Sequence, residues 1–462
     1  MSKYPYSLRN FTALAERESR RGKDISHVVP STKRTVAALR ELREAYKLEI
    51  KDLTLDSPER LAARERYQEK RLDLRKSLDS VLEESLQNAL NHFQSALSNR
   101  SFEWGLENGV LLGERQTYRI SSSLDVVFPG REAATILREA SGTHMVGRNS
   151  IVRALKHSLM KRYAHAVYRL DIRSFFDSIP HKKLLNRIAE VRSLDRITGE
   201  LVERLLHEYQ LLKGEPIGIP QGVGVSSPLA ELYLSDFDRA IRSFPGVLFY
   251  ARYVDDIIVV LEGEEACNQV ASKIDLLLSE LDLEVNKSDD KFAKIVADSN
   301  GDYLEDESVE YLGYKFIRSN GRLVIGLTDR RSKRRKNRLN TAFEHWLSKN
   351  PTRKTANSGD EGILVDRVRF LAGNTSLKNS KDNVAVGIYF SNSSLDSDAQ
   401  ELKDLDELLS NLIKTNRSRM SPLLLKRLRA VSFVRSFRER TFIRFRQKRL
   451  EQVVQCWKAE QS

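Results

Sequence analysis

Two adjacent aspartates, Asp255 and Asp256, lie between two strongly apolar runs, Val247–Tyr250 and Ile257–Leu261. Both runs are rich in residues that favour strands, so the pattern predicts a β-hairpin with acids at its tip. Like charges held side by side in a rigid turn repel each other, and burial makes the repulsion costlier. A divalent cation would offset that cost, whereas a solvated Asp-Asp turn is the common alternative.

A third acid, Asp171, ends the strand-like segment Tyr168–Ile172, and Arg173–Pro180 follows it. Between this acid and the hairpin lies the Gly-rich, Pro-bounded segment Gly218–Pro228, which leads into a helix expected over Leu229–Ile241. Glycines let backbone approach a nucleotide closely. The order of these segments favours a site for metal and phosphate over an isolated acidic turn.

In this order, the segments around Asp171, Gly218–Pro228 and Tyr253–Asp256 resemble motifs A, B and C of reverse transcriptases, the last being similar to the YxDD box. The resemblance implies an α+β right-hand polymerase fold, with fingers, a palm with an antiparallel sheet, and a helical thumb. It also implies an RNA-directed DNA polymerase, a nucleotidyltransferase that binds dNTPs. Two Mg²⁺ ions, or Mn²⁺, about 3.5–4 Å apart would clamp the attacking 3′-oxygen and the leaving pyrophosphate.

The resemblance assigns the catalytic and metal-binding residues. Asp171 and Asp255 would bridge the metal ions, because hard cations prefer carboxylate oxygen. The carbonyl of Ile172 would contribute to the ion on the nucleotide side. Asp256 would be a second, less indispensable acid.

The same resemblance assigns the nucleotide pocket. Phe176 would pack against the sugar and disfavour a 2′-hydroxyl, with ordinary core packing as the alternative, whereas Phe175 is expected in the core. Gln221 and Gly222 would lie over the incoming nucleotide.

Motif D is expected after an amphipathic helix over Glu264–Leu283, around Asn286. Lys287 and Lys291 compete there for the role of the lysine that assists pyrophosphate departure, with a solvated turn as the alternative. The segment Glu310–Phe316 resembles the primer-grip hairpin that follows the palm.

The fingers lack the Arg-x-Ile-Pro-like string that often binds the triphosphate. Arg131, Arg148 and Arg153 are the candidates for that role, and each is equally compatible with a solvated arginine. Arg131 follows a strand-like run, Leu124–Phe128, which suggests a finger hairpin. Arg148 leads into a helix expected over Val152–Ala164.

The chain of 462 residues carries 77 Lys and Arg against 64 Asp and Glu, a net charge of +13 and a pI near 9.5. This excess favours a polyanionic partner. Two cysteines provide neither a disulfide framework nor a zinc pair, as expected in a cytoplasmic protein. The start of the chain lacks an apolar signal segment and no run of eighteen apolar residues exists, so we expect no membrane partner.

Four regions are expected: a helical N-terminal arm over 1–100, fingers over 101–165, a palm over 166–317, and a thumb with a helical C-terminal extension over 318–462. Ser57 and Pro58 form a helix start signal in the arm. The arm could bind a partner or pack on the fingers.

Basic residues gather twice beyond the palm. Seven of the nine residues Arg330–Arg338 are basic, and we expect Arg331, Arg334 and Arg335 to contact the phosphate backbone of a nucleic acid, with a solvated face as the alternative. The segment from Arg435 to Lys448 interleaves arginine with phenylalanine, which predicts a packed thumb helix with one phosphate-facing side. Stacking of bases on these aromatics is the alternative.

The motif B segment and the strings Arg369–Thr375 and Val386–Phe390 look like bacterial defence-associated reverse transcriptases, with the type 3 systems the closest match. That resemblance implies an RNA template or noncoding RNA as partner, a DNA product, and a second reverse transcriptase or another copy of the chain as further candidates. Template-independent or protein-primed DNA synthesis by the same site, and a non-catalytic RNA-binding scaffold, are the alternatives. Intact Asp171, Asp255 and Asp256 argue against the scaffold.

Overall fold

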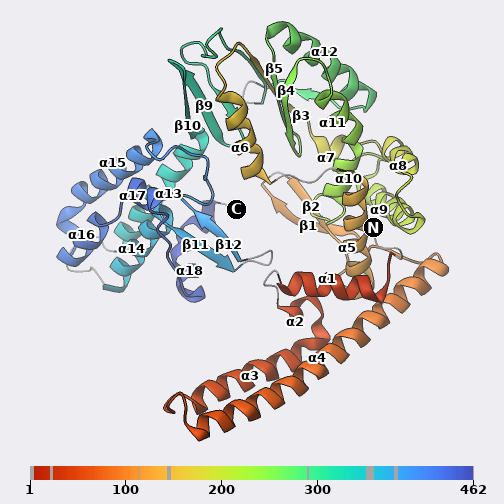
Figure 1. Ribbon diagram of the computed structural model, residues 1–462, viewed down its shortest axis with the longest axis vertical. Coiled ribbons are helices and arrows are strands. Elements are labelled where there is room, and N and C mark those ends of the chain that lie inside the picture. The colour runs from red at the N-terminus through yellow and green to blue at the C-terminus, as the bar shows by residue number, and fades with distance from the viewer. Residues whose placement is uncertain are drawn as a thin grey trace.

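The computed structural model describes residues 5–20, 24–113, 115–142, 147–288, 291–349, 358–378 and 383–460. Figure 1 shows three parts arranged around a common centre. The N-terminal part is helical, the middle of the chain contains the largest sheet, and the C-terminal part is mostly helical. Within the described residues, no helix is both long and apolar enough to cross a membrane.

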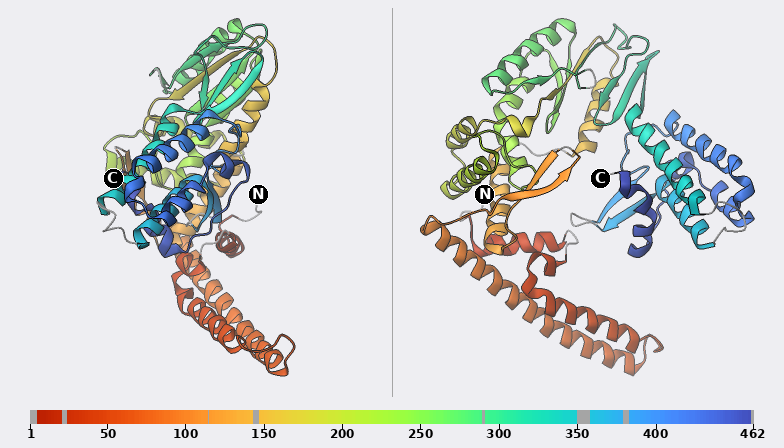
Figure 2. Two further views of the ribbon diagram at one scale, coloured as in Figure 1. Left: turned by 90° about the vertical axis from the view of Figure 1, so that its left-hand side faces the viewer. Right: turned by 180° about the vertical axis from the view of Figure 1, so that it is seen from behind.

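The N-terminal part consists of helices that begin with α1 and end with α4: α1 (Leu8–Arg20), α2 (Ile25–Val28), α3 (Lys33–Glu49) and α4 (Pro58–Ser98). The start of α4 is confirmed, because Ser57 Oγ accepts a hydrogen bond from the N–H of Arg60 at 3.2 Å. Helix α3 and the first half of α4 form a hairpin that projects from the body (Figures 1 and 2). The second half of α4 buries Leu86, Leu90 and Phe93 against the fingers. One helix therefore forms both a projecting arm and part of the fingers.

The fingers contain a hairpin of β1 (Glu107–Leu112) and β2 (Arg115–Arg119), followed by α5 (Leu124–Ala140). The expectation of a strand over Leu124–Phe128 is wrong, because these residues open α5, which continues through Pro129. Packing against α1, α4, α9 and α10 outweighs the helix-breaking effect of that proline. Gly130 is needed here, since a Cβ would lie 2.9 Å from the ring of Trp104.

The palm sheet has the strand order β4-β5-β3-β6, and β7 also pairs with β3. Every one of these pairings is antiparallel, as the expected fold requires. The strands are β3 (Ala166–Ile172), β4 (Val247–Tyr253), β5 (Asp256–Leu261), β6 (Val285–Asn286) and β7 (Ala293–Val296).

The palm sheet separates two apolar cores, because alternate residues of a strand face opposite sides. On β5, Ile257 and Val259 face the core shared with the fingers, whereas Ile258 and Val260 face the core shared with the C-terminal part. Leu170 of β3 faces the first core and Val167 the second. Both faces are covered, which makes the strands rigid supports for the acids at their ends.

The helices of the palm and its entry are α6 (Arg148–Leu159), α7 (Phe175–Ser178), α8 (His181–Glu190), α9 (Arg196–Lys213), α10 (Ser226–Tyr233), α11 (Ser235–Arg242) and α12 (Glu264–Glu280). The single helix expected over Leu229–Ile241 is two helices that break at Leu234. Leu232, Tyr233, Leu234 and Phe237 are all buried, more neighbouring positions than one amphipathic face can bury.

A second antiparallel sheet, β10-β9-β8, follows the palm: β8 (Val309–Tyr311), β9 (Tyr314–Ser319) and β10 (Arg322–Leu327). The hairpin expected over Glu310–Phe316 is confirmed, but the palm boundary expected at residue 317 falls inside β9.

The C-terminal part contains α13 (Asp329–Lys349), α14 (Ser358–Ala372), β11 (Asn374–Lys378), β12 (Asn383–Gly387), α15 (Gln400–Thr415), α16 (Pro422–Arg429), α17 (Phe433–Arg438) and α18 (Gln447–Val454). The helix expected from Arg435 to Lys448 is wrong for its middle, because α17 ends at Arg438 and α18 begins at Gln447. The residues between them pair with Asn374 instead, so tertiary pairing prevails over helical pattern.

Candidate active site

Three carboxylates meet where β3, β5 and the turn before β5 come together. Asp171 near the end of β3 lies directly opposite Asp256 at the start of β5, and Asp255 occupies the turn. The N–H of Ile172 donates to the carbonyl of Asp255 at 3.0 Å, which ties the turn to β3. The antiparallel register therefore brings together the acids that the sequence keeps apart.

The tip of the hairpin is braced by Arg252, which sequence reasoning missed. Its side chain, 3% exposed, donates to Glu231 at 2.8 Å and to Asp238 at 2.6 Å. It also donates to the carbonyl of Val254 at 2.9 Å, and Val254 has a left-handed φ of 63°. The buried Asp238 and the half-buried Glu231 thus hold the arginine that stabilises a strained turn. The signal available in the sequence was a cation at an otherwise apolar strand position.

The negative charges of the palm carboxylates are destabilised by their surroundings. Burial raises the pKa of Asp255 above its ordinary value, and the neighbouring Asp171 raises it further. Burial also raises the pKa of Asp256 to about 6, although Arg169 contacts that carboxylate at 3.1 Å and opposes the shift. Within the described part of the chain, Asp255 forms no ion pair. A half-buried carboxylate without an ion pair, beside a second acid, fits a hard divalent metal.

The protein provides fewer side-chain ligands than a metal ion needs for full coordination. Within the described residues, no group of three or more His, Cys, Asp or Glu side chains lies close enough to hold a metal ion. Asp256 is held by Arg169, which leaves Asp171 and Asp255 as the acids available to a metal. Polymerase metals commonly complete their coordination with water and substrate phosphates.

Of the two competing lysines, the structure brings Lys291 to the carboxylates. Lys291 Nζ lies 3.5 Å from Asp171 Oδ1, and Asn286 Nδ2 donates to Asp171 Oδ2 at 3.3 Å. Lys287 instead lines a surface cavity of about 780 Å³ between α12 and β6.

The Gly-rich loop lies between the fingers hairpin and the segment after β3. The N–H of Ile219 donates to the carbonyl of Phe176 at 2.8 Å, and the carbonyl of Gln221 accepts from the N–H of Tyr118 at 2.7 Å. Gly222 has a φ of +99°, and a Cβ there would lie 2.7 Å from the carbonyl oxygen of Tyr118. Gln221 and Gly222 therefore lie between β2 and the half-buried Phe176, whose ring meets that of the buried Phe175 at 5.6 Å.

The fingers contribute a different arginine from those expected. Arg115, the first residue of β2, is exposed, and its charge lowers the pKa of Asp255 slightly against the larger upward effects. Arg131 lies on α5, with its guanidinium over Phe128 and beside Glu18 and Arg17 of α1. Arg153 is exposed on α6 and donates to the carbonyl of Asn149. The missed signal for Arg115 was its place just after Gly113, in the turn region of a short hairpin.

Arg148 belongs to an arginine cluster at the turn between β8 and β9. It donates to the carbonyl of Leu312 at 2.9 Å and lies over the ring of Tyr314. Arg331 donates to the carbonyl of Gly313 at 3.3 Å and also lies over Tyr314. A Cβ at Gly313 would lie 2.4 Å from the Arg331 side chain, so glycine is required for this packing.

The remaining arginines of this cluster follow on α13. Arg334 is exposed and Arg335 half-buried. Burial, then the charge of Arg148, lowers the pKa of Arg331 to about 10. Burial and the charge of Arg331 lower the pKa of Arg335 to about 10 as well. Within the residues that the structure describes, neither Arg331 nor Arg335 has an acidic partner.

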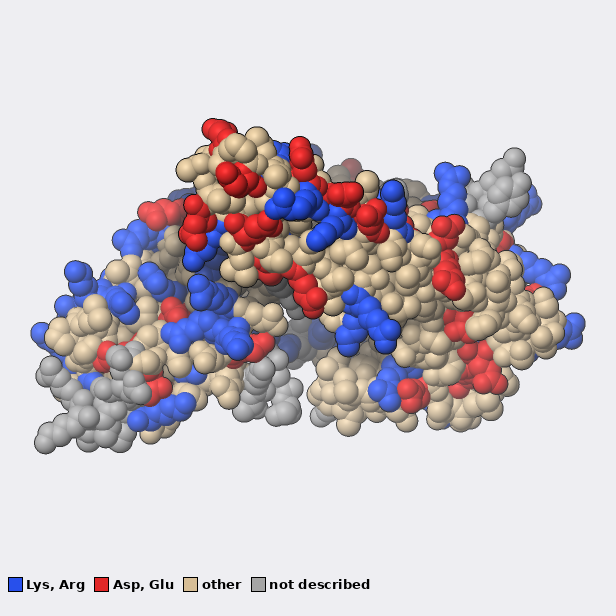
Figure 3. All heavy atoms as spheres, turned by 90° about the horizontal axis from the view of Figure 1, so that it is seen from below, with Lys and Arg blue, Asp and Glu red and all other residues tan. Residues whose placement is uncertain are grey.

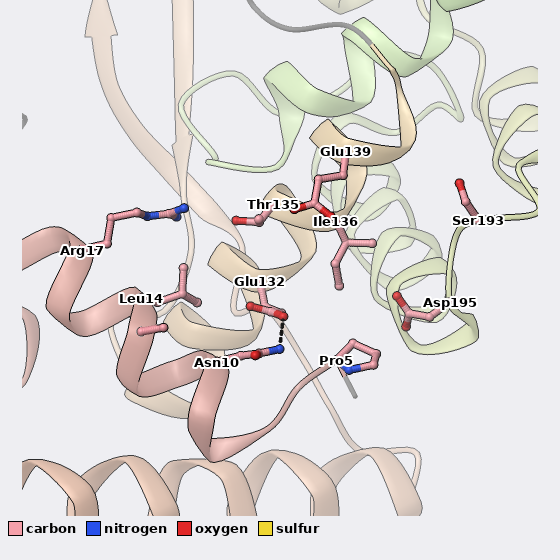
Figure 4. Close-up of a pocket in the computed structure, with 11 residues that line it drawn as sticks. Pro5, Asn10, Leu14, Arg17, Glu132, Thr135, Ile136, Glu139, Ser193 and Asp195 are labelled. Carbon is pink, nitrogen blue, oxygen red and sulfur yellow. Dashed lines mark hydrogen bonds between the residues drawn. The ribbon is translucent and has the colours of Figure 1, made fainter. Parts of the chain in front are cut away.

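A separate cavity of about 330 Å³ lies between α1, α5 and the segment before α9 (Figure 4). Asn10 donates to the buried Glu132 at 2.7 Å across it. Asp195 caps α9 by accepting from the N–H of Thr198 at 2.9 Å. The bond between Asn10 and Glu132 joins α1 to α5 and helps to fix α1 on the fingers.

Residues 114–316 match the family model described as reverse transcriptase (RNA-dependent DNA polymerase). This segment is a reverse transcriptase domain. The match covers the fingers strand β2, the palm and the first strands of the second sheet, and it makes the chain an enzyme of the RNA-directed DNA polymerase class. No curated protein sequence matches the chain significantly.

Solved structures similar to the chain include telomerases of two Candida species. The apo telomerase of Candida tropicalis truncated from its C-terminal domain has a TM-score of 0.37 and 12% identity, over 56% of this chain and 69% of that one. The Candida tropicalis telomerase with a TWJ fragment of telomeric RNA has a TM-score of 0.36 and 12% identity, over 99% and 87%. The Candida albicans telomerase with such a fragment has a TM-score of 0.31 and 13% identity, over 71% and 56%. The assignment of the reverse transcriptase domain rests on the sequence match.

Proposed function

We propose that this protein copies RNA into DNA, with divalent metal ions held by Asp171 and Asp255, and that it does so in a prokaryotic antiviral defence system. The observation that carries the polymerase proposal is the meeting of the buried Asp171, near the end of β3, with the half-buried Asp255 in the turn before β5, whose pKa is raised. The defence role is supported by the resemblance of the sequence to defence-associated reverse transcriptases.

The residues around the acids have distinct parts in this proposal. When bound, two Mg²⁺ or Mn²⁺ ions supply the positive charge that stabilises the phosphoryl group in transit. The carbonyl of Ile172 would be a further ligand on the nucleotide side. Asp256, held by Arg169, would add negative charge beside the metals.

The incoming deoxynucleotide fits between the Gln221-Gly222 loop, Phe176 and the fingers hairpin. Arg169 is engaged with Asp256, whereas Lys291 and Arg115 carry positive charges that lower the pKa of Asp255, and we assign these two to the triphosphate. Arg131 and Arg148 are left out of this role, because their guanidinium groups pack on Phe128 and Tyr314. Phe176 excludes the 2′-hydroxyl in this arrangement, and the relative use of ribonucleotides by Phe176→Ala tests that role.

Template and primer require a positively charged path outside the palm. Arg331, Arg334 and Arg335 of α13 provide charge next to the hairpin that resembles a primer grip. Arginine clusters contact phosphate without reading bases, which suits an enzyme that must accept many sequences. An RNA template or a noncoding RNA is the proposed partner.

Extension of a DNA primer on a defined RNA template, followed by sequencing of the product, tests the polymerase proposal. We expect DNA complementary to the template with Mg²⁺ or Mn²⁺, and none from Asp255→Asn. Product unrelated to the template would indicate template-independent synthesis, and product covalently attached to the protein would indicate protein priming. Folded protein that incorporates no nucleotide in the presence of its copurified RNA would favour the scaffold.

Plating of phage on cells that carry the gene in its natural neighbourhood tests the defence role. We expect fewer plaques with the wild-type gene than with Asp255→Asn. Equal plating across a broad phage panel, with both proteins expressed, would contradict a defence role and leave the polymerase proposal intact.

A further inference from the structure

The segment between α17 and α18 is held as an added strand on the C-terminal sheet. The N–H of Asn374 donates to the carbonyl of Thr441 at 2.9 Å, and the N–H of Ile443 donates to the carbonyl of Asn374 at 2.7 Å. Asn374 is 1% exposed and pairs with Phe442 in a parallel bridge. The backbone around Phe442 is therefore fixed by the folded core.

This segment presents different side chains on its two faces, because alternate residues of an extended chain point to opposite sides. Ile443 and Phe445 are half-buried, and the Phe445 ring meets the ring of Phe370 at 6.2 Å. Phe442, Arg444 and Arg446 are exposed, with 43% of Phe442 accessible. One face thus offers an aromatic ring followed by two guanidinium groups.

A cavity of about 570 Å³ lies beside this face. Its polar lining consists of three arginines, one glutamate and two hydroxyl residues: Arg369, Arg435, Arg444, Glu439, Ser436 and Thr441. Arg369 and Arg444 have no ion pair among the described residues. Figure 3 shows Lys and Arg side chains gathered over the C-terminal part of the chain, on the left of the view. Three arginines against one glutamate leave the cavity positively charged, which suits phosphate.

We propose that Phe442, with Arg369, Arg435 and Arg444, binds an unpaired nucleotide within a single strand of nucleic acid. The base stacks on the exposed ring of Phe442, and the arginines contact the adjoining phosphates. Stacking on an aromatic side chain accepts any base, and an unpaired base reaches the ring whereas a base inside a duplex does not. The site lies outside the match to the reverse transcriptase family and does not depend on Asp171 or Asp255.

Fluorescence anisotropy with the full chain tests this site directly, in EDTA and without dNTPs so that catalysis plays no part. The probes are labelled oligo-rU and oligo-dT of about 12 nucleotides and a duplex of equal length. We expect Phe442→Ala to bind both single strands about tenfold more weakly, Phe442→Trp to bind them like wild type, and duplex affinity to stay unchanged. Arg444→Gln should lower the salt slope of single-strand binding by about 0.7.

Matched controls lie on the neighbouring helix α16. Leu423→Ala removes an apolar side chain that is 56% exposed, and Arg427→Gln removes an exposed arginine outside the cavity. Both should bind as wild type. A larger effect of Phe442→Ala on oligo-rU would identify the RNA strand as the ligand, and a larger effect on oligo-dT the DNA product. Unchanged single-strand binding by Phe442→Ala and by the Arg369→Gln, Arg444→Gln double variant, or equal losses on duplex and single strands, would overturn the proposal.

Discussion

The palm hairpin and the turn between β8 and β9 each gather charges of one sign. Asp171 and Asp255 lie together in the palm, and burial with mutual repulsion raises the pKa of Asp255. Arg148 and Arg331 lie together over Tyr314, and burial with mutual repulsion lowers the pKa of Arg331 to about 10. In the palm hairpin the charged form of Asp255 is destabilised, and at the turn between β8 and β9 the charged form of Arg331 is destabilised.

The difference between the regions lies in the ligand that would relieve the repulsion. A divalent cation suits two carboxylates, whereas nucleic acid phosphates suit several arginines. Arg252 differs from both regions, because Glu231 and Asp238 pair with it inside the protein. Repulsion between like charges therefore distinguishes the proposed ligand sites from this structural ion pair.

The largest expected effect is on nucleotide incorporation, and it should differ between Asp171 and Asp256. Asp171→Asn should reduce nucleotide incorporation by several orders of magnitude, because that carboxylate contacts Lys291 only at 3.5 Å and is available to metal. Asp256→Asn should cost less, since Arg169 holds that carboxylate. Single-turnover incorporation on an RNA template measures both. Equal losses would show that Asp256 also acts directly at the metal.

The next comparison is between two lysines of motif D. Lys291→Ala should lower the rate about a hundredfold, because Lys291 alone of the two contacts Asp171. Lys287→Ala is the matched control and should stay within a few-fold of wild type, because Lys287 lines the cavity between α12 and β6 and forms no ion pair with the palm acids among the described residues. Pre-steady-state rates at saturating nucleotide decide between them. A reversed order would place the catalytic lysine at 287.

A smaller effect is expected from the arginine cluster. Replacing Arg331, Arg334 and Arg335 with Gln should weaken duplex binding about equally across sequences. The salt slope should fall by about 0.9 for each arginine that touches a phosphate. Binding isotherms over a range of salt concentrations measure this. An unaltered slope would mean that the cluster only braces the β8–β9 turn.

The smallest effect concerns the support of the Gly-rich loop. His181 Nε2 lies 2.8 Å from the carbonyl oxygen of Gly218, and burial lowers the pKa of His181 below its ordinary 6.5. The unfolded chain therefore takes up a proton that the folded chain resists, and this stability is lost as pH falls below about 6.5.

The Tm of wild type should fall between pH 7 and pH 5, and the Tm of His181→Gln should fall by about 1–2 °C less. His207→Gln changes an exposed histidine of α9 and should leave the drop unchanged. Thermal unfolding by circular dichroism at both pH values compares the three proteins. If the Tm of His181→Gln falls between pH 7 and pH 5 by as much as the Tm of wild type, then His181 does not resist protonation in the folded chain.

The strands and acids of the palm could be predicted because local pattern and tertiary role agree there. Ile257–Leu261 is apolar at every position, as a strand buried on both faces requires, and Asp255 and Asp256 directly precede it. Arg252 could not be assigned, since its partners Glu231 and Asp238 come from helices whose packing the sequence does not specify. The helix through Pro129 and the extended chain at Phe442 were mispredicted because packing with distant segments overrides local preference there.

Thermal unfolding with and without metal tests most directly whether the palm acids are held for a cation. In EDTA at pH 7, Asp255→Asn should be more stable than wild type, because it removes one of two repelling carboxylates. Mn²⁺ should raise the Tm of wild type and leave that of Asp255→Asn nearly unchanged. The account would be contradicted if Asp255→Asn had a lower Tm than wild type in EDTA. It would also be contradicted if Mn²⁺ raised the Tm of Asp255→Asn as much as it raised that of wild type.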